Sequence, residues 1–256
     1  MKSYDNFGNI IVVKFPKNFA LKDKKKFAEK LLKEQKGVKT VLEKKERIKG
    51  RLRKLSTNYI AGENTKEVLY RENGCVFRFN IDKTYFSPRL SNERKEIASK
   101  IKKGELVLVM FAGVAPYSIV IAKLSKAKKV FSNEINREAN KYAELNIKLN
   151  KVKDKIKLVN GDIKRIADKL KEKFDVIVMP RPQLKETFLK QAFMLSKKGA
   201  RIYYYDFCKD DEIDSVVEKI KKEAKKYKKK IKILNIKRAG ELAPYKIRLR
   251  VDFKII

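Results

Sequence analysis

Residues 105–121 read Glu-Leu-Val-Leu-Val-Met-Phe-Ala-Gly-Val-Ala-Pro-Tyr-Ser-Ile-Val-Ile, an apolar run that stops at Gly113 and a helical pattern that begins at about Pro116. The run Leu106–Phe111 does not alternate between polar and apolar residues, which is typical of a strand buried on both faces of a parallel sheet. Gly113 allows a sharp turn and close approach to a ligand, and Pro116 suits the first position of a helix. The segment predicts the first strand, loop and helix of a doubly wound α/β sheet, which binds ligands at the carboxyl ends of its strands. A strand-to-helix turn without a ligand explains this segment alone equally well.

Polar residues follow each of the next three predicted strands. Lys128–Ser132 leads into Asn133-Glu134, Lys157–Asn160 into Gly161-Asp162, and Phe174–Met179 into Pro180-Arg181-Pro182. An acid about twenty residues after the first loop is placed to accept hydrogen bonds from a ribose. Glu134 and Asp162, in register behind the Gly113 loop, therefore predict a cofactor that carries a nucleoside.

Composition excludes several classes of protein. The 256 residues, 43% of them hydrophobic, are enough for one large domain and a small one. The sequence contains no histidine and only two cysteines, far apart, which excludes the usual zinc sites and any histidine-dependent triad. No apolar run is long enough to span a membrane and the first fifteen residues lack a signal-peptide core. We expect a cytoplasmic, monomeric protein with no metal and no membrane partner.

The charge predicts a nucleic-acid partner. Lys and Arg number 66 against 31 Asp and Glu, a formal net charge of +35, and each phosphate that a protein neutralises releases counterions. Lysine-rich composition is also typical of hyperthermophiles and of solvated helix faces. We assign the eight lysines of Lys221–Lys232 to the outer face of a helix. The total excess is too large for solubility alone, so we expect RNA or DNA binding.

Two domains are predicted. Residues 1–84 form a small α+β domain that faces RNA, with 22 Lys and Arg against 10 Asp and Glu. Its predicted helix, Leu21–Lys36, turns four apolar side chains inward: Leu21, Phe27, Leu31 and Leu32. Its predicted strands are Ile10–Phe15, Val38–Leu42, Arg51–Leu55, Glu67–Tyr70 and Cys75–Ile81. Residues 85–256 form the sheet domain, which opens with a helix at Ser87–Lys102 and ends with a helix at Glu212–Lys230 and strands at Ile231–Ile236 and Lys246–Ile255.

Four segments resemble, in order and spacing, the archaeal and eukaryotic tRNA (guanine(37)-N1)-methyltransferase family. They are Glu72-Asn-Gly-Cys-Val-Phe-Arg-Phe79, Tyr85-Phe-Ser-Pro-Arg-Leu-Ser-Asn-Glu-Arg94, Met110-Phe-Ala-Gly-Val-Ala-Pro-Tyr117 and Asn146-Ile-Lys-Leu-Asn150. The second segment is the most specific. The resemblance implies a class I S-adenosylmethionine methyltransferase domain of Rossmann-like fold after the small α+β domain. It also implies S-adenosyl-L-methionine as cofactor and the anticodon loop of a tRNA, with tRNA-Phe expected, as substrate.

The resemblance also implies roles for single residues. Glu93 is the general base and Arg53 contacts the reacting guanine; both choices suit the chemistry, because N1 must lose a proton before it attacks and O6 then gains negative charge. The methyl donor is already a sulfonium, so no metal is needed. Without the motif, Glu93 reads as an ion-pair partner on an exposed helix and Arg53 as a phosphate contact. The implied cofactor-binding residues are Arg94, Phe111, Ala112, Gly113, Glu134, Ile135, Asp162 and Ile163. The implied substrate-binding residues are Arg53, Arg89, Pro180 and Pro182.

The sequence departs from the family pattern at three places. Val109 replaces an acid, Ala115 replaces the second glycine of the loop, and Pro180-Arg181-Pro182 replaces an Asn-x-Pro element. Some archaeal members with such a proline-containing variant also methylate carbon 7 of the tricyclic wyosine precursor at the same nucleotide, and the resemblance implies this as a candidate second reaction here. Two alternatives stay open. The first is an aminocarboxypropyl transferase of wyosine synthesis, but the retained Glu93 argues against it. The second is a non-catalytic RNA-binding protein with a degenerate cofactor pocket, which the replacements Val109 and Ala115 suggest.

Overall fold

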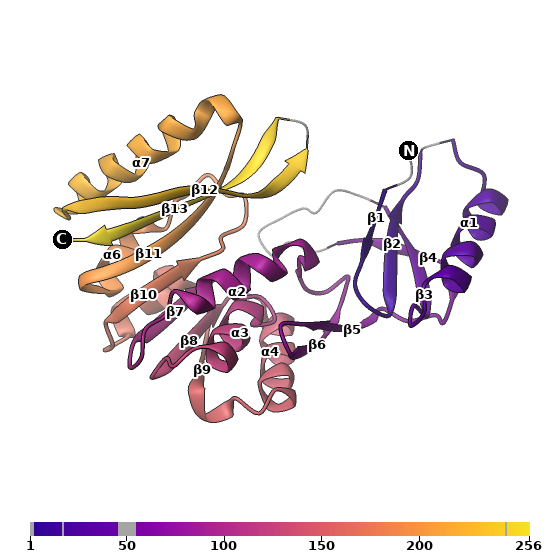
Figure 1. Cartoon of the computed structure of the whole chain (residues 1–256), viewed down its shortest axis with the longest axis horizontal. Coiled ribbons are helices and arrows are strands. Elements are labelled where there is room, and N and C mark those ends of the chain that lie inside the picture. The colour runs from indigo at the N-terminus through magenta and orange to yellow at the C-terminus, as the bar shows by residue number, and fades with distance from the viewer. Residues whose placement is uncertain (1–2, 17, 46–54, 244) are drawn as a thin grey trace.

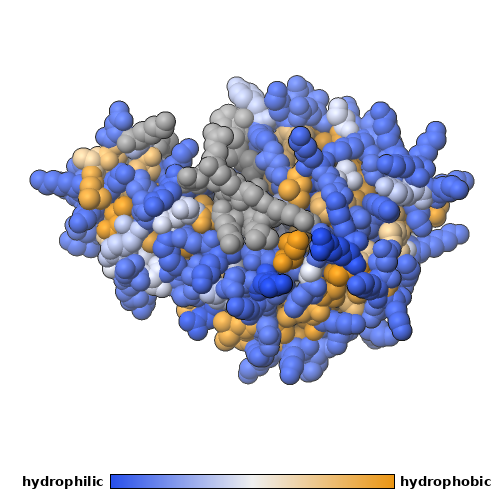
Figure 2. Space-filling model, turned by 180° about the vertical axis from the view of Figure 1, so that it is seen from behind, coloured by the Kyte–Doolittle hydropathy of each residue, from blue (hydrophilic) through white to orange (hydrophobic). Residues whose placement is uncertain are grey.

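The computed structural model describes residues 3–16, 18–45, 55–243 and 245–256. These residues form two lobes, a small one from the N-terminal part of the chain and a large one around a broad sheet, with a hairpin lying between them (Figure 1). No helix in the described ranges is long and apolar enough to cross a membrane. Figure 2 shows hydrophilic side chains over most of the rear face of both lobes.

The small lobe is a four-stranded sheet with one helix packed against it. Strand order is β1-β2-β3-β4, and β2 and β3 run parallel because α1 connects them. The bounds are β1 Ser3–Asn6, β2 Ile10–Lys14, α1 Leu21–Glu34, β3 Thr40–Lys44 and β4 Thr57–Gly62. Ala28 and Leu31 of α1 are buried against the sheet.

The small lobe contains the predicted helix and the first two predicted strands, with one side chain that was predicted to be buried misplaced. The helix and the first two predicted strands are confirmed within two residues. The prediction that Leu21 points inward is wrong: it is 61% exposed, because it is the first residue of α1 and the apolar face begins a turn later. The strand predicted at Arg51–Leu55 falls outside the described residues except for Leu55, which lies in no strand.

The hairpin of β5 (Glu67–Glu72) and β6 (Cys75–Asn80) docks on helix α4 (Arg137–Leu149) of the large lobe. Asn146 and its neighbour one turn later, Asn150, hold the backbone of β6. The amide oxygens of Asn146 and Asn150 accept hydrogen bonds from the N–H groups of Arg78 (2.7 Å) and Val76 (2.8 Å), and their amide nitrogens donate to the carbonyls of the same two residues (3.1 and 2.7 Å). The spacing Asn-x-x-x-Asn puts both amides on one helix face, which explains this part of the motif.

The large lobe is a seven-stranded sheet of order β12-β13-β11-β10-β7-β8-β9. Strands β7 to β11 run parallel to one another, and β13 is antiparallel to both β11 and β12. The strands are β7 Leu106–Met110, β8 Lys129–Glu134, β9 Ile156–Asn160, β10 Phe174–Met179, β11 Ser196–Cys208, β12 Ile231–Ala243 and β13 Lys246–Ile255. The doubly wound sheet and its four predicted parallel strands are confirmed, whereas β12 extends well beyond the predicted Ile231–Ile236.

Helices cover both faces of this sheet. One face carries α2 (Ser91–Ser99), α3 (Pro116–Leu124) and α4, and the other carries α5 (Ile163–Ile166), α6 (Leu189–Leu195) and α7 (Ile213–Lys226). Val107 and Val109 point into the first core layer while Leu108 and Met110 point into the second. This two-sided burial is why the β7 sequence shows no alternation. The lysines of α7 cover its outer face, as predicted, since Val216, Val217, Ile220 and Ala224 are buried.

Candidate active site at the carboxyl ends of the parallel strands

A cavity of about 1070 Å³, counting the solvent at its mouth, lies at the carboxyl ends of β7, β8, β9 and β10. This is where ligands bind in doubly wound sheets. Residues predicted from distant parts of the sequence meet in its wall. They are Arg94, Phe111, Ala112, Gly113, Glu134, Ile135, Asp162, Ile163, Pro180 and Pro182.

The loop after β7 is tightly wound. Phe111, Gly113 and Ala115 have φ angles of 58°, 58° and 67°, in the left-handed region. A Cβ on Gly113 would meet the Tyr85 carbonyl oxygen at 3.3 Å, so the loop needs glycine there for both conformation and space. Ala115 adopts the left-handed conformation at the start of α3 at a cost of about 1–2 kcal/mol, which explains why a glycine is usual at this position.

Glu134 ends β8 with a buried carboxylate that is already hydrogen bonded to the backbone. Oε1 accepts from the N–H groups of Ile135 (2.8 Å) and Asn136 (2.7 Å), and Oε2 accepts from that of Gly113 (2.8 Å). Burial raises the pKa of Glu134 above its usual value, and the three backbone hydrogen bonds oppose that rise. A carboxylate offers about four acceptor sites, so Oε2 retains one for a ligand hydroxyl.

Asp162 follows β9 and begins helix α5. Its Oδ1 accepts from the N–H of Lys164 (3.1 Å), an N-cap hydrogen bond that fixes the carboxylate beside Gly161. The next residue, Ile163, is buried in the core with one side on the cavity. The strand tips of β8 and β9 thus each present an acid to the same space.

Arg94 lines the cavity, but its charge is already paired. The guanidinium forms a two-pronged ion pair with Glu72 of the hairpin, donates to the Ser87 carbonyl (3.0 Å) and lies 5.0 Å from the centre of the Phe86 ring. It therefore fastens the Tyr85-Phe86-Ser87 segment, which forms one wall of the cavity, to helix α2.

Glu93 lies one hydrogen bond behind the cavity wall. Its carboxylate accepts from the Tyr205 hydroxyl (2.8 Å), is ion-paired with the buried Arg250 and lies 3.2 Å from the Lys237 ammonium. Tyr205 lines the cavity, whereas Glu93 does not. Burial raises the pKa of Tyr205 well above 10, so its hydroxyl stays protonated and donates to Glu93.

A second cleft adjoins the first and runs between the small lobe and the β12–β13 hairpin. Its wall includes the cationic side chains of Lys14, Lys44 and Arg89, and burial lowers the pKa of Lys44. Arg89, a predicted substrate contact, lies here and pairs with Asp5 at 2.6 Å. Arg53 lies outside the residues that the structure describes.

Arg181, between Pro180 and Pro182, was not predicted as a site residue. It is buried and ties the loop after β10 to the end of β11, donating to Asp206 (2.6 Å), to the Tyr204 hydroxyl (3.0 Å) and to the Leu184 carbonyl (2.9 Å). An arginine two residues after the apolar run 176–179, with an aspartate directly after the apolar run 202–205, was a signal for this pair. Tyr205 and Arg248, which also line the cavity, had no such local signal.

The described residues include no group of three or more His, Cys, Asp or Glu side chains that could hold a metal ion. Cys75 and Cys208 are both buried and unpaired with each other. Burial raises the pKa of each thiol to about 11. Both therefore remain protonated and are poor nucleophiles.

Comparisons with known proteins agree with this geometry. Residues 68–234 match the TRM5/TYW2 methyltransferase domain, and residues 1–65 match the TYW2 N-terminal domain. The chain is 36% identical to the tRNA (guanine(37)-N(1))-methyltransferase Trm5b of Pyrococcus abyssi, over 99% of this chain and 74% of that protein. It is 34% identical to the tRNA (guanine(37)-N(1))/4-demethylwyosine(37)-methyltransferase Taw22 of Nanoarchaeum equitans, over 99% of this chain and 100% of that protein.

Two solved structures show the same architecture with ligands. The complex of aTrm5 and tRNALeu superimposes with a TM-score of 0.88 at 31% identity, covering 99% of this chain and 72% of that one. The Pyrococcus horikoshii TYW2 complex with MeSAdo superimposes with a TM-score of 0.82 at 27% identity, covering 99% of this chain and 90% of that one.

Proposed function

The chain belongs to the TRM5/TYW2 methyltransferase family, and we propose that it transfers the methyl group of S-adenosylmethionine to N1 of guanosine 37 in tRNA. The fold is accordingly a class I methyltransferase domain with a smaller N-terminal domain before it. The observation that carries the proposal is the single cavity in which Glu134, Asp162 and the Gly113 loop meet at the ends of β7, β8 and β9.

The residues of the cavity fit S-adenosylmethionine. The free acceptor site of Glu134 suits a ribose hydroxyl, and the absence of a side chain on Gly113 leaves room where a Cβ would touch the Tyr85 carbonyl at 3.3 Å. Asp162 and Ile163 add an acceptor and an apolar surface for the adenine end. When bound, this cofactor supplies an activated methyl group on a sulfonium.

Glu93 is the proposed base for the N1 proton. The carboxylate is reached from the cavity through the Tyr205 hydroxyl, 2.8 Å away. The bound guanine must therefore bring N1 within hydrogen-bond reach of Glu93 itself or of Tyr205. Such contacts tighten in the substrate complex in many enzymes. Arg250 and Lys237 hold Glu93 in place meanwhile.

The second candidate reaction is methylation of carbon 7 of 4-demethylwyosine at the same nucleotide. Pro180 and Pro182 line the cavity with side chains that make no hydrogen bonds, a wall that suits a larger tricyclic base. The relative Taw22, whose name includes this substrate, matches over its full length. If carbon 7 attacks the methyl group before any proton leaves, a base is needed only after the methyl transfer.

Mass spectrometry of nucleosides tests both reactions. Two substrates are incubated with the protein and S-adenosylmethionine: an unmodified tRNA-Phe transcript and the same tRNA carrying 4-demethylwyosine. We expect 1-methylguanosine from the first substrate, and a methylated tricyclic nucleoside from the second if the protein performs both reactions. A product heavier by an aminocarboxypropyl group would contradict the methyltransferase proposal and favour the alternative transferase. No product from either tRNA would favour the non-catalytic RNA-binding protein.

Replacing Glu93 with Gln tests its role as base. The side chain keeps its shape but loses its basicity, so we expect the single-turnover rate on guanosine to fall by about a hundred to ten thousandfold. The loss should be smaller on carbon 7. Glu96→Gln is the matched control, because Glu96 shares Arg250 and Lys237 with Glu93 but, among the described residues, has no hydrogen bond to Tyr205, which links Glu93 to the cavity. A wild-type rate in Glu93→Gln, with the control unchanged, would exclude Glu93 as the base.

We also propose that the basic N-terminal domain, residues 1–84, contacts the anticodon loop and that the protein acts as a monomer in the cytoplasm. The cationic cleft beside the N-terminal lobe supports the first part. Footprinting of bound tRNA and light scattering at working concentration test the contact and the oligomeric state.

A further inference from the structure

Four arginines are buried among the described residues, and Arg248 differs from the other three. Three of these four have carboxylate partners: Arg94 pairs with Glu72, Arg181 with Asp206, and Arg250 with Glu93, Glu96 and Asp252. Arg248 is only 8% exposed, yet among the residues that the structure describes it has no carboxylate within ion-pair distance. Its contacts are a long hydrogen bond to the Tyr85 hydroxyl (3.4 Å) and the Phe207 ring, 5.3 Å away.

A buried guanidinium without a counter-charge is costly. Removing a charge from water is favourable only when other charges or hydrogen bonds replace the water. A guanidinium carries five N–H donors, and in the described part of the chain Arg248 directs one weak hydrogen bond to protein. Arg248 contributes none of the fully buried, unpartnered side-chain atoms of the described residues, so its remaining donors face the open cavity and are available to an anionic ligand.

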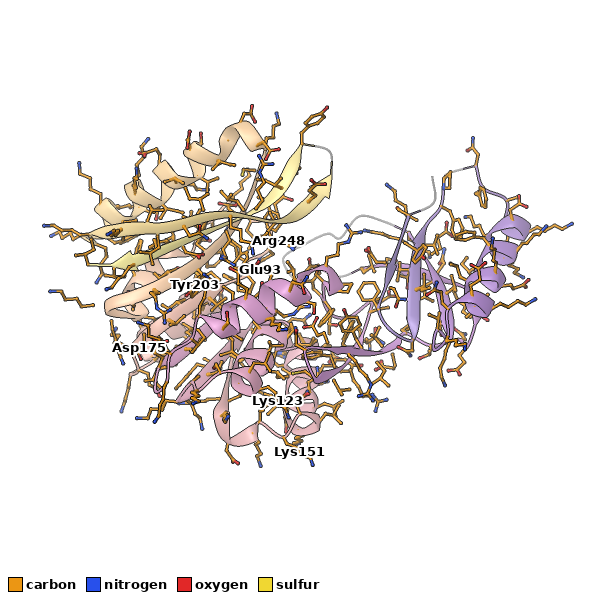
Figure 3. The ribbon with its side chains drawn as sticks, in the orientation of Figure 1. Glu93, Lys123, Lys151, Asp175, Tyr203 and Arg248 are labelled. Carbon is orange, nitrogen blue, oxygen red and sulfur yellow. The ribbon has the colours of Figure 1, made fainter. Side chains whose placement is uncertain are left out.

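The position of Arg248 indicates which ligand it meets. It lies on β13 opposite Phe207 of β11, and it lines both the cavity at the strand ends and the cleft between the lobes. Four residues line both spaces, Tyr85, Phe86, Ser87 and Arg248, and Arg248 is the charged one among them. Figure 3 shows Arg248 and Glu93 in the region where the β12–β13 hairpin faces helix α2. Arg248 thus stands where the methyl donor and an entering nucleotide would meet.

We propose that Arg248 binds an anionic oxygen of the target nucleotide. This inference rests on the proposed function. When the N1–H bond breaks, the proton goes to Glu93 and the electron pair stays on the ring, where it delocalises onto O6. The N1 pair then bonds to the methyl carbon as the carbon–sulfur bond breaks. A planar guanidinium suits either that O6 or a phosphodiester oxygen of the same nucleotide, because each accepts charge-assisted hydrogen bonds.

The test compares Arg248→Met and Arg248→Lys with Arg238→Met. Arg238 is exposed on the same hairpin and pairs with Asp210, so its replacement removes one charge without touching the cavity. A phosphodiester contact predicts that Arg248→Met weakens tRNA binding by about tenfold and lowers the slope of log affinity against log salt by about one, with an unchanged saturated rate. An O6 contact predicts unchanged binding and a single-turnover rate lower by about a hundred to a thousandfold, which lysine restores in part.

Other outcomes would overturn the inference. The inference fails if Arg248→Met and Arg238→Met have the same tRNA affinity, the same salt slope and the same single-turnover rate. Another such outcome is weakened binding of S-adenosylmethionine, which would place Arg248 on the cofactor. A fall in melting temperature together with lost activity would indicate a structural role, whereas removal of an unpaired buried charge should preserve or raise it. If the wild-type protein methylates no tRNA, the proposed function fails, but the salt slope still reports on the phosphodiester contact.

Discussion

Glu134 combines burial with three backbone hydrogen bonds, and the two effects on its charge oppose each other. Burial raises the pKa of the carboxyl group, while the N–H groups of Gly113, Ile135 and Asn136 favour its ionised form. A ribose hydroxyl that donates to Oε2 would favour the ionised form further. Cofactor binding should therefore be linked to loss of a proton from Glu134.

The sign of this linkage can be measured by calorimetry. The ionised carboxylate accepts the ribose hydroxyl, so affinity for S-adenosylmethionine should be highest above the raised pKa and fall as pH drops through it. Glu134→Gln should weaken binding by about 1–3 kcal/mol and remove the pH dependence. Asp162→Ala should cost a similar amount yet keep the pH dependence. A wild-type affinity that stays constant across the acidic range would contradict the assignment of Glu134 to the ribose.

Residues at strand tips were predictable from sequence, whereas partners from distant strands were not. Gly113, Glu134 and Asp162 follow directly from local patterns, because the end of a parallel strand fixes where the next residues lie. The Tyr205 hydroxyl that separates Glu93 from the cavity comes from 112 residues further along the chain. Its place depends on how β11 packs against α2, which no local pattern reports.

Helix α2 is held to the β12–β13 hairpin by a partly buried group of charges. Arg250 of β13 and Lys237 of β12 hold both Glu93 and Glu96 of the helix, and Arg250 also pairs with Asp252 (2.7 Å). Burial alone would raise the pKa of Glu96, but hydrogen bonds from Arg250 and Lys237 lower it to about 2. This group of charges fixes the proposed base relative to the cavity.

Arg250→Met should destabilise the protein by about 3–5 kcal/mol, because it leaves buried carboxylates without their main partner. In the wild type, Glu96 contributes stability above its ordinary pKa of 4.5, and this contribution is lost as pH falls towards about 2. Urea unfolding at neutral and acid pH measures both effects, with Arg238→Met as the control. Equal stability of the two variants at neutral pH would show that this group of charges does not hold the fold.

The central strands of the large sheet were predictable from their apolar runs, whereas the edge strand β1 of the small sheet was not. Strands β7 and β10 contain apolar runs that are typical of a covered parallel sheet. Strand β1 reads Ser-Tyr-Asp-Asn and is mostly exposed, so neither its composition nor its pattern indicated a strand. The boundary between domains at residue 84 stays a prediction; the β5–β6 hairpin before it docks on α4 of the large lobe.

The whole molecule carries a formal charge of +35, and its cationic cleft lies between the two lobes. Binding of tRNA should therefore release several counterions, and affinity should fall by about a hundredfold or more between low and moderate salt. Fluorescence anisotropy across a salt series measures this slope. Binding of S-adenosylmethionine is the internal control and should vary little, since hydrogen bonds rather than phosphate contacts hold it. A tRNA affinity that does not change with salt would contradict the inference that the positive charge of the protein binds phosphates.

Strand β12 is the outer strand of the seven-stranded sheet, and its free edge is a potential site of aggregation. Leu234 and Ile236 are 48% and 42% exposed there. The strand is interrupted by three register shifts against β13 and presents Lys232 and Arg238 to solvent. A strand from a second copy would need a straight, uncharged edge on which to pair, and β12 offers neither. We therefore expect the charged and irregular edge of β12 to disfavour strand pairing between copies of the protein.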